Sequence, residues 1–287
     1  MEPIKDYEVY DSRMKKALID KAFFLDMVDA EVFVDYGCAD ASLFGLMSDI
    51  FPEYTYIGYD FDEKMIQKAY ETMYHRSRAT IEDLDYFFHY KWDNIVKKIK
   101  EKTKTGKKSC LILSSVIHEV YNYLNEDQIK EFWDRVVNSG LFDYVVIRDM
   151  TRSWFSLENF IPEESDIDSN STMVEHVRET CRENSSLNSR LFDFEMKYGS
   201  IDKLRNLAHF FLKYRYEENW DHELNENYFA TSIFDIVQHF DRDMWDNEYA
   251  NNFIPPFIKK QILKDFGFTF DKPTHVKLVF SRRELMR

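Results

Sequence analysis

Two aspartates in the first part of the chain each follow a short apolar run. Asp35 follows residues 32–34 (VFV), and Asp60, 25 residues later, follows residues 56–59 (YIGY). An acid at the end of a buried strand can accept hydrogen bonds from both hydroxyls of a ribose. Each such charge-assisted bond is worth about 1.5–3 kcal/mol. The two acids therefore indicate a site for a ligand that contains a nucleoside.

A strand, a tight turn, a helix and a second strand must position these acids. The runs 32–34 and 56–59 predict strands, and residues 41–51 between them predict a helix. A strand that turns directly into a helix brings backbone N–H groups and the positive helix end to the ligand crevice. Gly37 allows the sharp turn and a close approach of the ligand to the backbone. This order is the opening of a doubly wound α/β domain.

The residues of the turn select among nucleoside ligands. A dinucleotide fingerprint requires G-x-G-x-x-G, but Asp35 and Asp40 occupy the first and third glycine positions here. Because a carboxylate repels a pyrophosphate, NAD is disfavoured. A ligand with an ammonium group suits both acids better, and S-adenosylmethionine carries an ammonium and a sulfonium.

At this point the chain resembles the class I S-adenosylmethionine-dependent methyltransferases. Residues 35–41 (DYGCADA) are similar to the family's acid-x-Gly-x-Gly-x-Gly turn, with Ala39 and Ala41 where glycine is usual. Residues 58–62 (GYDFD), followed by 65–66 and Ala69, are similar to its second motif. The resemblance implies S-adenosylmethionine as cofactor. The cofactor-binding residues that it implies are Asp35, Gly37, Cys38, Ala39, Asp40, Asp60, Phe61, Trp92, Asp93 and Ser115.

The assignment of Trp92 and Asp93 depends on the third strand, predicted over residues 86–90 (YFFHY). In the family an acid after this strand often faces the adenine amino group, with an apolar neighbour against the ring. Asp93 and Trp92 stand at the corresponding positions. An alternative of equal weight is that Asp93 only caps the helix expected over residues 94–104.

Candidate catalytic residues follow the fourth strand, predicted over residues 110–116 (CLILSSV) because this run is apolar throughout. In the family the end of this strand lies beside the transferred methyl group. A histidine or glutamate there could take a proton from a hydroxyl or amine nucleophile. A polar residue at this point can instead cap the next helix or position the cofactor. The catalytic candidates are His118, Glu119 and Tyr121, with Ser115 beside them.

No metal site is expected, because position 122 is Asn and the zinc-protease motif is incomplete. After a helix over 125–137 and a strand over 144–147, the alternation of strands and helices stops. The expected fold is α/β: a doubly wound, Rossmann-like seven-stranded sheet with an antiparallel last strand, plus a mostly helical insertion after strand five. The methyltransferase core is expected over 1–150 and 264–287, with the last strand at 274–280. The insertion, a cap on the substrate side, is expected over 151–263, with helices over 172–183, 186–198, 201–216 and 230–240.

Two helical segments bear on ligand and partner. A helix over 11–27, capped by Asp11 or Ser12, is expected before the first strand, where family members often carry a helix that can cover the cofactor. Residues 91–108 hold eight lysines. The loop of this segment leads into the fourth strand and so lies at the edge of the sheet opposite the ligand edge. We therefore expect these lysines to form a solvated helix face.

Composition limits the compartment and the partners. The 287 residues carry a net charge of −14, which argues against a protein that grips long nucleic acid along its phosphates. The three cysteines form no spaced framework, which fits a reducing compartment. Neither an apolar membrane span nor an apolar signal core is present, so we expect a soluble, cytoplasmic protein without a membrane partner.

The expected function is methyl transfer from S-adenosylmethionine to an oxygen or nitrogen nucleophile. From the acceptors that are usual in this family, we expect RNA or a nucleotide first, a small molecule second and a protein third. One alternative is a non-catalytic binding or scaffold protein on the same fold, which the loss of glycine at Ala39 and Ala41 favours. Another is a different adenosyl enzyme such as an aminopropyl transferase, but no paired aspartates after the fourth strand suggest a polyamine pocket.

Overall fold

The computed structural model describes residues 17–80, 83–152, 155–156, 159–160 and 172–283. Their contacts divide the chain into two units, which we call the sheet unit and the helical unit. Among the described residues, the sheet unit holds 17–80, 83–149, 234–251 and 277–283, and the helical unit holds 150–152, 155–156, 159–160, 172–233 and 252–276. None of the helices in these described ranges is both long and apolar enough to cross a membrane.

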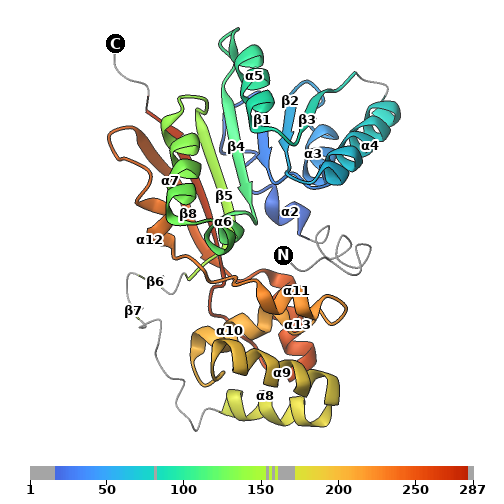
Figure 1. Ribbon diagram of the computed structural model, residues 1–287, viewed down its shortest axis with the longest axis vertical. Helices are drawn as coiled ribbons and strands as arrows, with labels where there is room; N and C mark the ends of the chain where they lie inside the picture. The colour runs from blue at the N-terminus through green and yellow to red at the C-terminus, as the bar shows by residue number, and fades with distance from the viewer. Residues whose placement is uncertain (1–16, 81–82, 153–154, 157–158, 161–171, 284–287) are drawn as a thin grey trace. The chain divides into compact units, whose positions relative to one another are not determined.

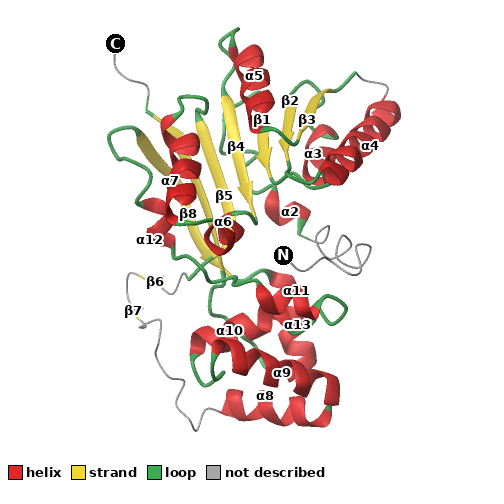
Figure 2. Ribbon diagram, in the orientation of Figure 1, coloured by secondary structure: helices red, strands yellow, loops and turns green. Residues whose placement is uncertain are grey.

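The large sheet has seven strands in the order β3-β2-β1-β4-β5-β9-β8 (Figures 1 and 2). In chain order they are β1 (Val32–Tyr36), β2 (Thr55–Tyr59), β3 (Asp85–His89), β4 (Ser109–Ser114), β5 (Tyr144–Met150), β8 (Trp245–Phe253) and β9 (His275–Arg282). The first five pair in parallel, and Asp35 of β1 lies between Gly58 of β2 and Ile112 of β4. The carboxyl ends of these strands therefore share one edge of the sheet.

The last strand, β9, runs antiparallel to β5. The Arg282 N–H donates to the Asp143 carbonyl at 2.7 Å, and the Thr151 N–H donates to the Thr274 carbonyl at 3.3 Å. Successive residues of one strand thus meet the other strand in reverse order. The predicted seven-stranded sheet with an antiparallel last strand is confirmed.

Helices alternate with most of the strands of the sheet unit along the chain. They are α2 (Leu18–Lys21), α3 (Ser42–Ser48), α4 (Glu63–Thr80), α5 (Trp92–Thr103), α6 (Ile117–Tyr123), α7 (Glu126–Trp133), the π-helical turn η1 (Asp134–Asn138) and α12 (Ile233–Val237). Asn125 and Gln128 form a reciprocal capping box at the start of α7. Ile95 and Ile99 are the buried residues of α5. Figure 1 shows α5 and α7 in front of the strands, on one face of the sheet.

The helical unit has a separate apolar core. Its helices are α8 (Thr172–Glu183), α9 (Ser185–Tyr198), α10 (Leu204–Lys213), α11 (Trp220–Asn225) and α13 (Pro256–Phe266), and a short hairpin pairs β6 (Phe155–Ser156) with β7 (Asn159–Phe160). Phe194, Phe210 and Phe266 are fully or almost fully buried in this core. The helix predicted over 172–183 matches α8, and α10 is shorter than the predicted 201–216.

Strand β8 and the length of β5 differ from the predictions. The sequence of β8, WDNEYANNF, lies in the segment expected to be helical, and most of its side chains are partly or fully exposed. An edge strand with little buried surface lacks the alternating apolar pattern that marks a strand. β5 continues to Met150, past its predicted end at Ile147, so that Arg148 and Asp149 belong to the strand. The predicted N-terminal helix over 11–27 reaches into residues 1–16, outside the described residues. Within them, helix α2 covers only Leu18–Lys21 and residues 22–27 form turns, so the predicted helix is too long at its C-terminal end.

The boundaries between the sheet unit and the helical unit differ from those of the insertion expected over 151–263. Residues 234–251, within that range, group with the sheet, whereas residues 264–276, outside it, group with the helical unit.

Gly58 of β2 provides a test of the core. A Cβ atom at this position would lie 2.4 Å from Phe88 Cδ1 and 2.7 Å from Cys38 Sγ, which is too close. We expect Gly58→Ala to lower the free energy of unfolding by about 1–3 kcal/mol in denaturant titrations. The matched control is Gly45→Ala in α3, where the nearest atom would lie at 3.5 Å, so stability should stay the same or rise by up to about 1 kcal/mol. Equal effects of the two changes would contradict this account of the packing.

Candidate functional site

The turn after β1 is held against β2 and β4. The N–H groups of Gly37 and Cys38 both donate to the Tyr59 carbonyl, at 2.7 and 3.0 Å. Gly37 has φ +80°, and a Cβ atom there would lie 2.7 Å from Val116 Cγ2. Glycine is therefore required both by the backbone conformation and by the close approach of the segment after β4. Cys38 is buried beneath the turn, and burial raises its pKa well above the usual value.

The two alanines of the turn adopt conformations that glycine favours. Ala39 has φ +46° and Ala41 has φ +58°. A left-handed conformation costs a residue with a Cβ atom roughly 1–2 kcal/mol. The turn thus keeps glycine-like geometry in spite of both substitutions, because the surrounding strands and α3 fix its path.

Asp60 is anchored and keeps capacity for a ligand. Its Oδ2 accepts the Ala39 N–H at 3.0 Å and its Oδ1 accepts the Asp62 N–H at 2.9 Å. An ionised carboxylate has about four acceptor positions, so about two are not used by these backbone groups. Burial raises the pKa of Asp60, and the two backbone hydrogen bonds oppose this shift. The next side chain, Phe61, is 68% exposed.

Asp35 is a buried acid with an unsatisfied oxygen. Its residue exposure is 4%, and Oδ1 has no hydrogen-bond partner among the described residues. Burial raises the pKa of Asp35 to about 7, while the charge of Lys21 opposes the rise. Asp40 differs, because its two oxygens accept from the Ser42 N–H at 3.0 Å and the Ser42 hydroxyl at 2.7 Å, at the start of α3. Of these two acids, Asp35 is the one with an unsatisfied acceptor atom, Oδ1.

A group of charges that the sequence did not predict lies beside Asp35. Lys21 of α2 is part-buried, and burial, together with the charge of Arg148, lowers its pKa to about 8. Asp20 lies 2.8 Å from the Arg148 guanidinium and 2.5 Å from the Lys277 ammonium. These two contacts fix α2 to β5 and β9, and so fix Lys21 near Asp35. The only sequence signal was the polar Asp20-Lys21 pair within an amphipathic helix.

The end of β4 carries the histidine predicted as a base. Asp149 of β5 is fully buried; its Oδ2 accepts the N–H groups of Val116 and Ile117 at 2.8 and 2.6 Å. Its Oδ1 lies 2.6 Å from Nδ1 of His118, which is itself buried. Asp149 thus holds the start of α6 and the imidazole together. Ser115, with φ +60°, donates its N–H to the Arg148 carbonyl at 2.8 Å.

Tyr121 and Glu119 have different surroundings. The Tyr121 hydroxyl donates to the Asp235 carbonyl at 3.2 Å, accepts from the Trp133 indole at 3.2 Å and lies 3.3 Å from His239 Nε2. These contacts tie α6 to α7 and α12, which is a packing role. Glu119 lies in the first turn of α6 and is part-buried.

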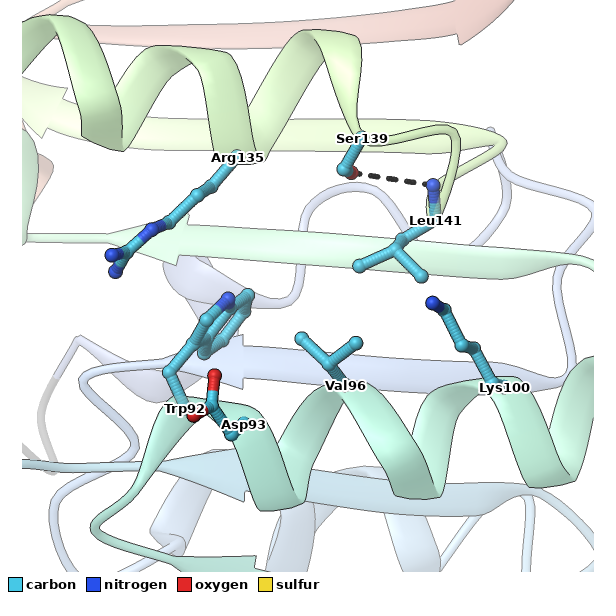
Figure 3. Close-up of a pocket in the computed structure, with 7 residues that line it drawn as sticks. All are labelled: Trp92, Asp93, Val96, Lys100, Arg135, Ser139 and Leu141. Atoms are coloured by element: carbon cyan, nitrogen blue, oxygen red, sulfur yellow. Dashed lines mark hydrogen bonds between the residues drawn. The ribbon is translucent and has the colours of Figure 1, made fainter.

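Trp92 and Asp93 lie in the first turn of α5, shortly after the end of β3. They line a groove of about 290 Å³ between α5 and the segment from η1 to Leu141, and none of the other predicted cofactor residues lines it (Figure 3). The Trp92 ring packs against Tyr36 and Tyr59, with centroids 5.3 and 5.5 Å apart. The helix α5 begins at Trp92 and has no side-chain cap, so the capping alternative for Asp93 is wrong.

Comparison with known proteins gives distant likenesses only. No family model and no curated protein matches the sequence. Among solved structures, PKMT2 from Rickettsia typhi is 12% identical with a TM-score of 0.49, over 94% of this chain and 53% of that one. The methyltransferase domain of bacterial CtHen1-C is 13% identical with a TM-score of 0.42, over 93% and 97%. The plantazolicin methyltransferase BpumL, solved with SAH, is 11% identical with a TM-score of 0.45, over 96% and 89%.

The chain spans about half the length of the PKMT2 structure. The order and the directions of its own seven strands identify its fold as the class I methyltransferase fold.

The raised pKa of Asp35 makes stability depend on pH. Because the folded protein binds this proton more tightly than the unfolded chain, the fold loses stability as pH rises from about 3.8 through about 7. We expect Asp35→Asn to raise the free energy of unfolding at pH 8 by on the order of 2–4 kcal/mol, and less at pH 5. Thermal unfolding at both pH values measures it. Asp26→Asn, at an exposed acid, should change little at either pH, and an equal loss at both pH values in Asp35→Asn would contradict the account.

Proposed function

We propose that this chain is an S-adenosylmethionine-dependent methyltransferase that acts on an oxygen or nitrogen nucleophile at the carboxyl edge of its sheet. One observation carries the proposal: the unsatisfied, buried Asp35 Oδ1 lies under a turn that keeps glycine-like geometry, next to an Asp60 with spare acceptor capacity. An ammonium group would satisfy the first acid, and ribose hydroxyls would satisfy the second.

The residues of the edge fit the parts of this cofactor. Asp60 would accept the ribose hydroxyls, with the exposed Phe61 ring beside it to cover the adenine. Asp35 would face the methionine ammonium. Lys21 is the nearby cation suited to the methionine carboxylate, because Arg148 is already paired with Asp20. Gly37 lets the turn pack directly against Val116, where a Cβ atom would be too close. The backbone of Cys38 to Asp40 and the Ser115 hydroxyl complete this edge.

The cofactor supplies an activated methyl group on a sulfonium, and the protein supplies position and a base. Catalysis of such a displacement rests mainly on holding the nucleophile in line. In this role His118 would donate from Nδ1 to Asp149 Oδ1, so that Nε2 carries the lone pair that takes a proton from the nucleophile. Asp149 fixes this tautomer and steadies the imidazolium that forms.

The scaffold alternative has less support than the sequence suggested. It depended on Ala39 and Ala41, yet both adopt the left-handed backbone that the family's glycines would adopt. We take RNA or a nucleotide as the first acceptor class and a small molecule as the second. The three cysteines are unpaired and buried, which suits a cytoplasmic setting.

Cofactor binding is the first test. Calorimetric titration with S-adenosylmethionine and S-adenosylhomocysteine should give binding that weakens about 10- to 100-fold in Asp60→Asn, since charge-assisted hydrogen bonds to the ribose are lost. Asp62→Asn is the matched control, because the only described contact of the Asp62 carboxylate is the Lys64 N–H and asparagine caps a helix as well. A folded wild-type protein that binds neither compound would overturn the proposal and favour the scaffold alternative.

The proposed base is tested on turnover. With an acceptor found by screening for S-adenosylhomocysteine release, His118→Ala should lower kcat by about 10²–10⁴-fold. Asp149→Asn should lower kcat and also alter its pH profile, because the imidazole tautomer is no longer fixed. Tyr121→Phe, which removes only a packing hydroxyl, should keep both. Full activity of a folded His118→Ala protein would contradict the assignment of His118 as the base.

A further inference from the structure

The groove between α5 and η1 has two chemically different ends (Figure 3). Val96 lies in its middle, and Leu141 adds a second apolar side chain at the end where Lys100 lies. Trp92, with the Arg135 guanidinium opposite, lies at one end, and Lys100 lies at the other, towards Leu141. This order suits a ligand with a flat aromatic part and an anionic part. The groove belongs wholly to the sheet unit.

The aromatic end can bind a base. Trp92 is already packed on Tyr36 and Tyr59, which holds its indole in one orientation. The part-exposed ring therefore offers a preformed surface for stacking, with little entropy to lose. The neighbouring Asp93 is exposed and has no capping hydrogen bond. A carboxylate beside a stacked base accepts from an exocyclic amino group such as cytosine N4.

The cationic end can bind a phosphate, because the lysines of this segment divide by helix face. Four lysines have acidic partners: Lys98 with Glu101, Lys102 with Asp85, Lys107 with Glu31 and Lys108 with Asp29. Lys97, Lys100 and Lys104 are exposed and form no ion pair within the described chain. Their spacing puts them on the same face of α5 as Asp93, the face with the groove. Of these three, Lys100 lines the groove.

The distance between the ends fits one nucleotide. Asp93 and Lys100 are seven residues apart, about 10 Å along the helix axis. We infer that this groove binds a nucleotide unit, with the base stacked on Trp92, its amino edge on Asp93 and its phosphate at Lys100. The inference that this groove selects the methyl acceptor rests on the proposed function, and it makes the acceptor a nucleotide. Binding of a nucleotide in the groove does not require the cofactor.

The test uses fluorescence anisotropy of labelled single-stranded oligo(C) and oligo(U) RNA of about ten nucleotides. Oligo(C) should bind roughly 5- to 100-fold more tightly, because only cytosine has the amino donor for Asp93, and Asp93→Ala should remove this preference. Lys100→Gln should weaken both strands and reduce the salt slope of log K by about one, while Lys98→Gln on the opposite face should not. Trp92→Ala should weaken both strands about tenfold.

Two further comparisons complete the test. Binding of cytidine 5′-monophosphate as tightly as oligo(C) would assign the groove to free nucleotides, and much weaker binding would assign it to a strand; both support the inference. No binding of any probe, or equal losses in Lys98→Gln and Lys100→Gln, would overturn it. Calorimetry with S-adenosylmethionine separates the two proposals, since Lys100→Gln should keep cofactor binding and Asp60→Asn should keep strand binding.

Discussion

A carboxylate buried at the end of β1 is the constraint on which the candidate site depends. Asp35 lies between Gly58 and Ile112 in the sheet, with one oxygen unsatisfied and a pKa raised by burial to about 7. A buried charge is costly unless a partner compensates it. Lys21 provides part of this compensation, and a ligand ammonium would provide the rest. The turn after Asp35 requires glycine at position 37, because the backbone is left-handed there and a Cβ atom would meet Val116.

The same edge depends on a second buried acid with a different task. Asp149 accepts two backbone N–H groups at the start of α6 and contacts the His118 imidazole. One carboxylate therefore sets the direction of α6 and the orientation of the candidate base together. A change at this position affects structure and chemistry at once, which is why the conservative amide is the informative substitution.

The local distribution of charges on α5 bears more on ligand binding than the net charge of the chain does. The chain has a net charge of −14, which argued against nucleic acid as a partner. On α5, however, acidic neighbours neutralise the lysines of one side only, and the other side borders a groove with an exposed acid and a fixed indole. A net charge averages over such a division, so it limits long-range attraction and says little about a site one nucleotide long.

By itself the sequence determined the fold class and the local chemistry of the first turn. Buried parallel strands such as β1 and β4 are continuous apolar runs, and the acid–glycine pair at Asp35 and Gly37 follows directly from the chain order. Strand β8 was missed because an edge strand buries too little surface to leave a pattern. Lys21, Arg148 and Asp149 could not be assigned, because each meets its partner across the sheet; Asp149 is 31 residues from His118. Only the tertiary structure decided which charges meet, since the packing of elements and not sequence spacing sets those distances, and it alone showed the groove that Trp92 and Asp93 line.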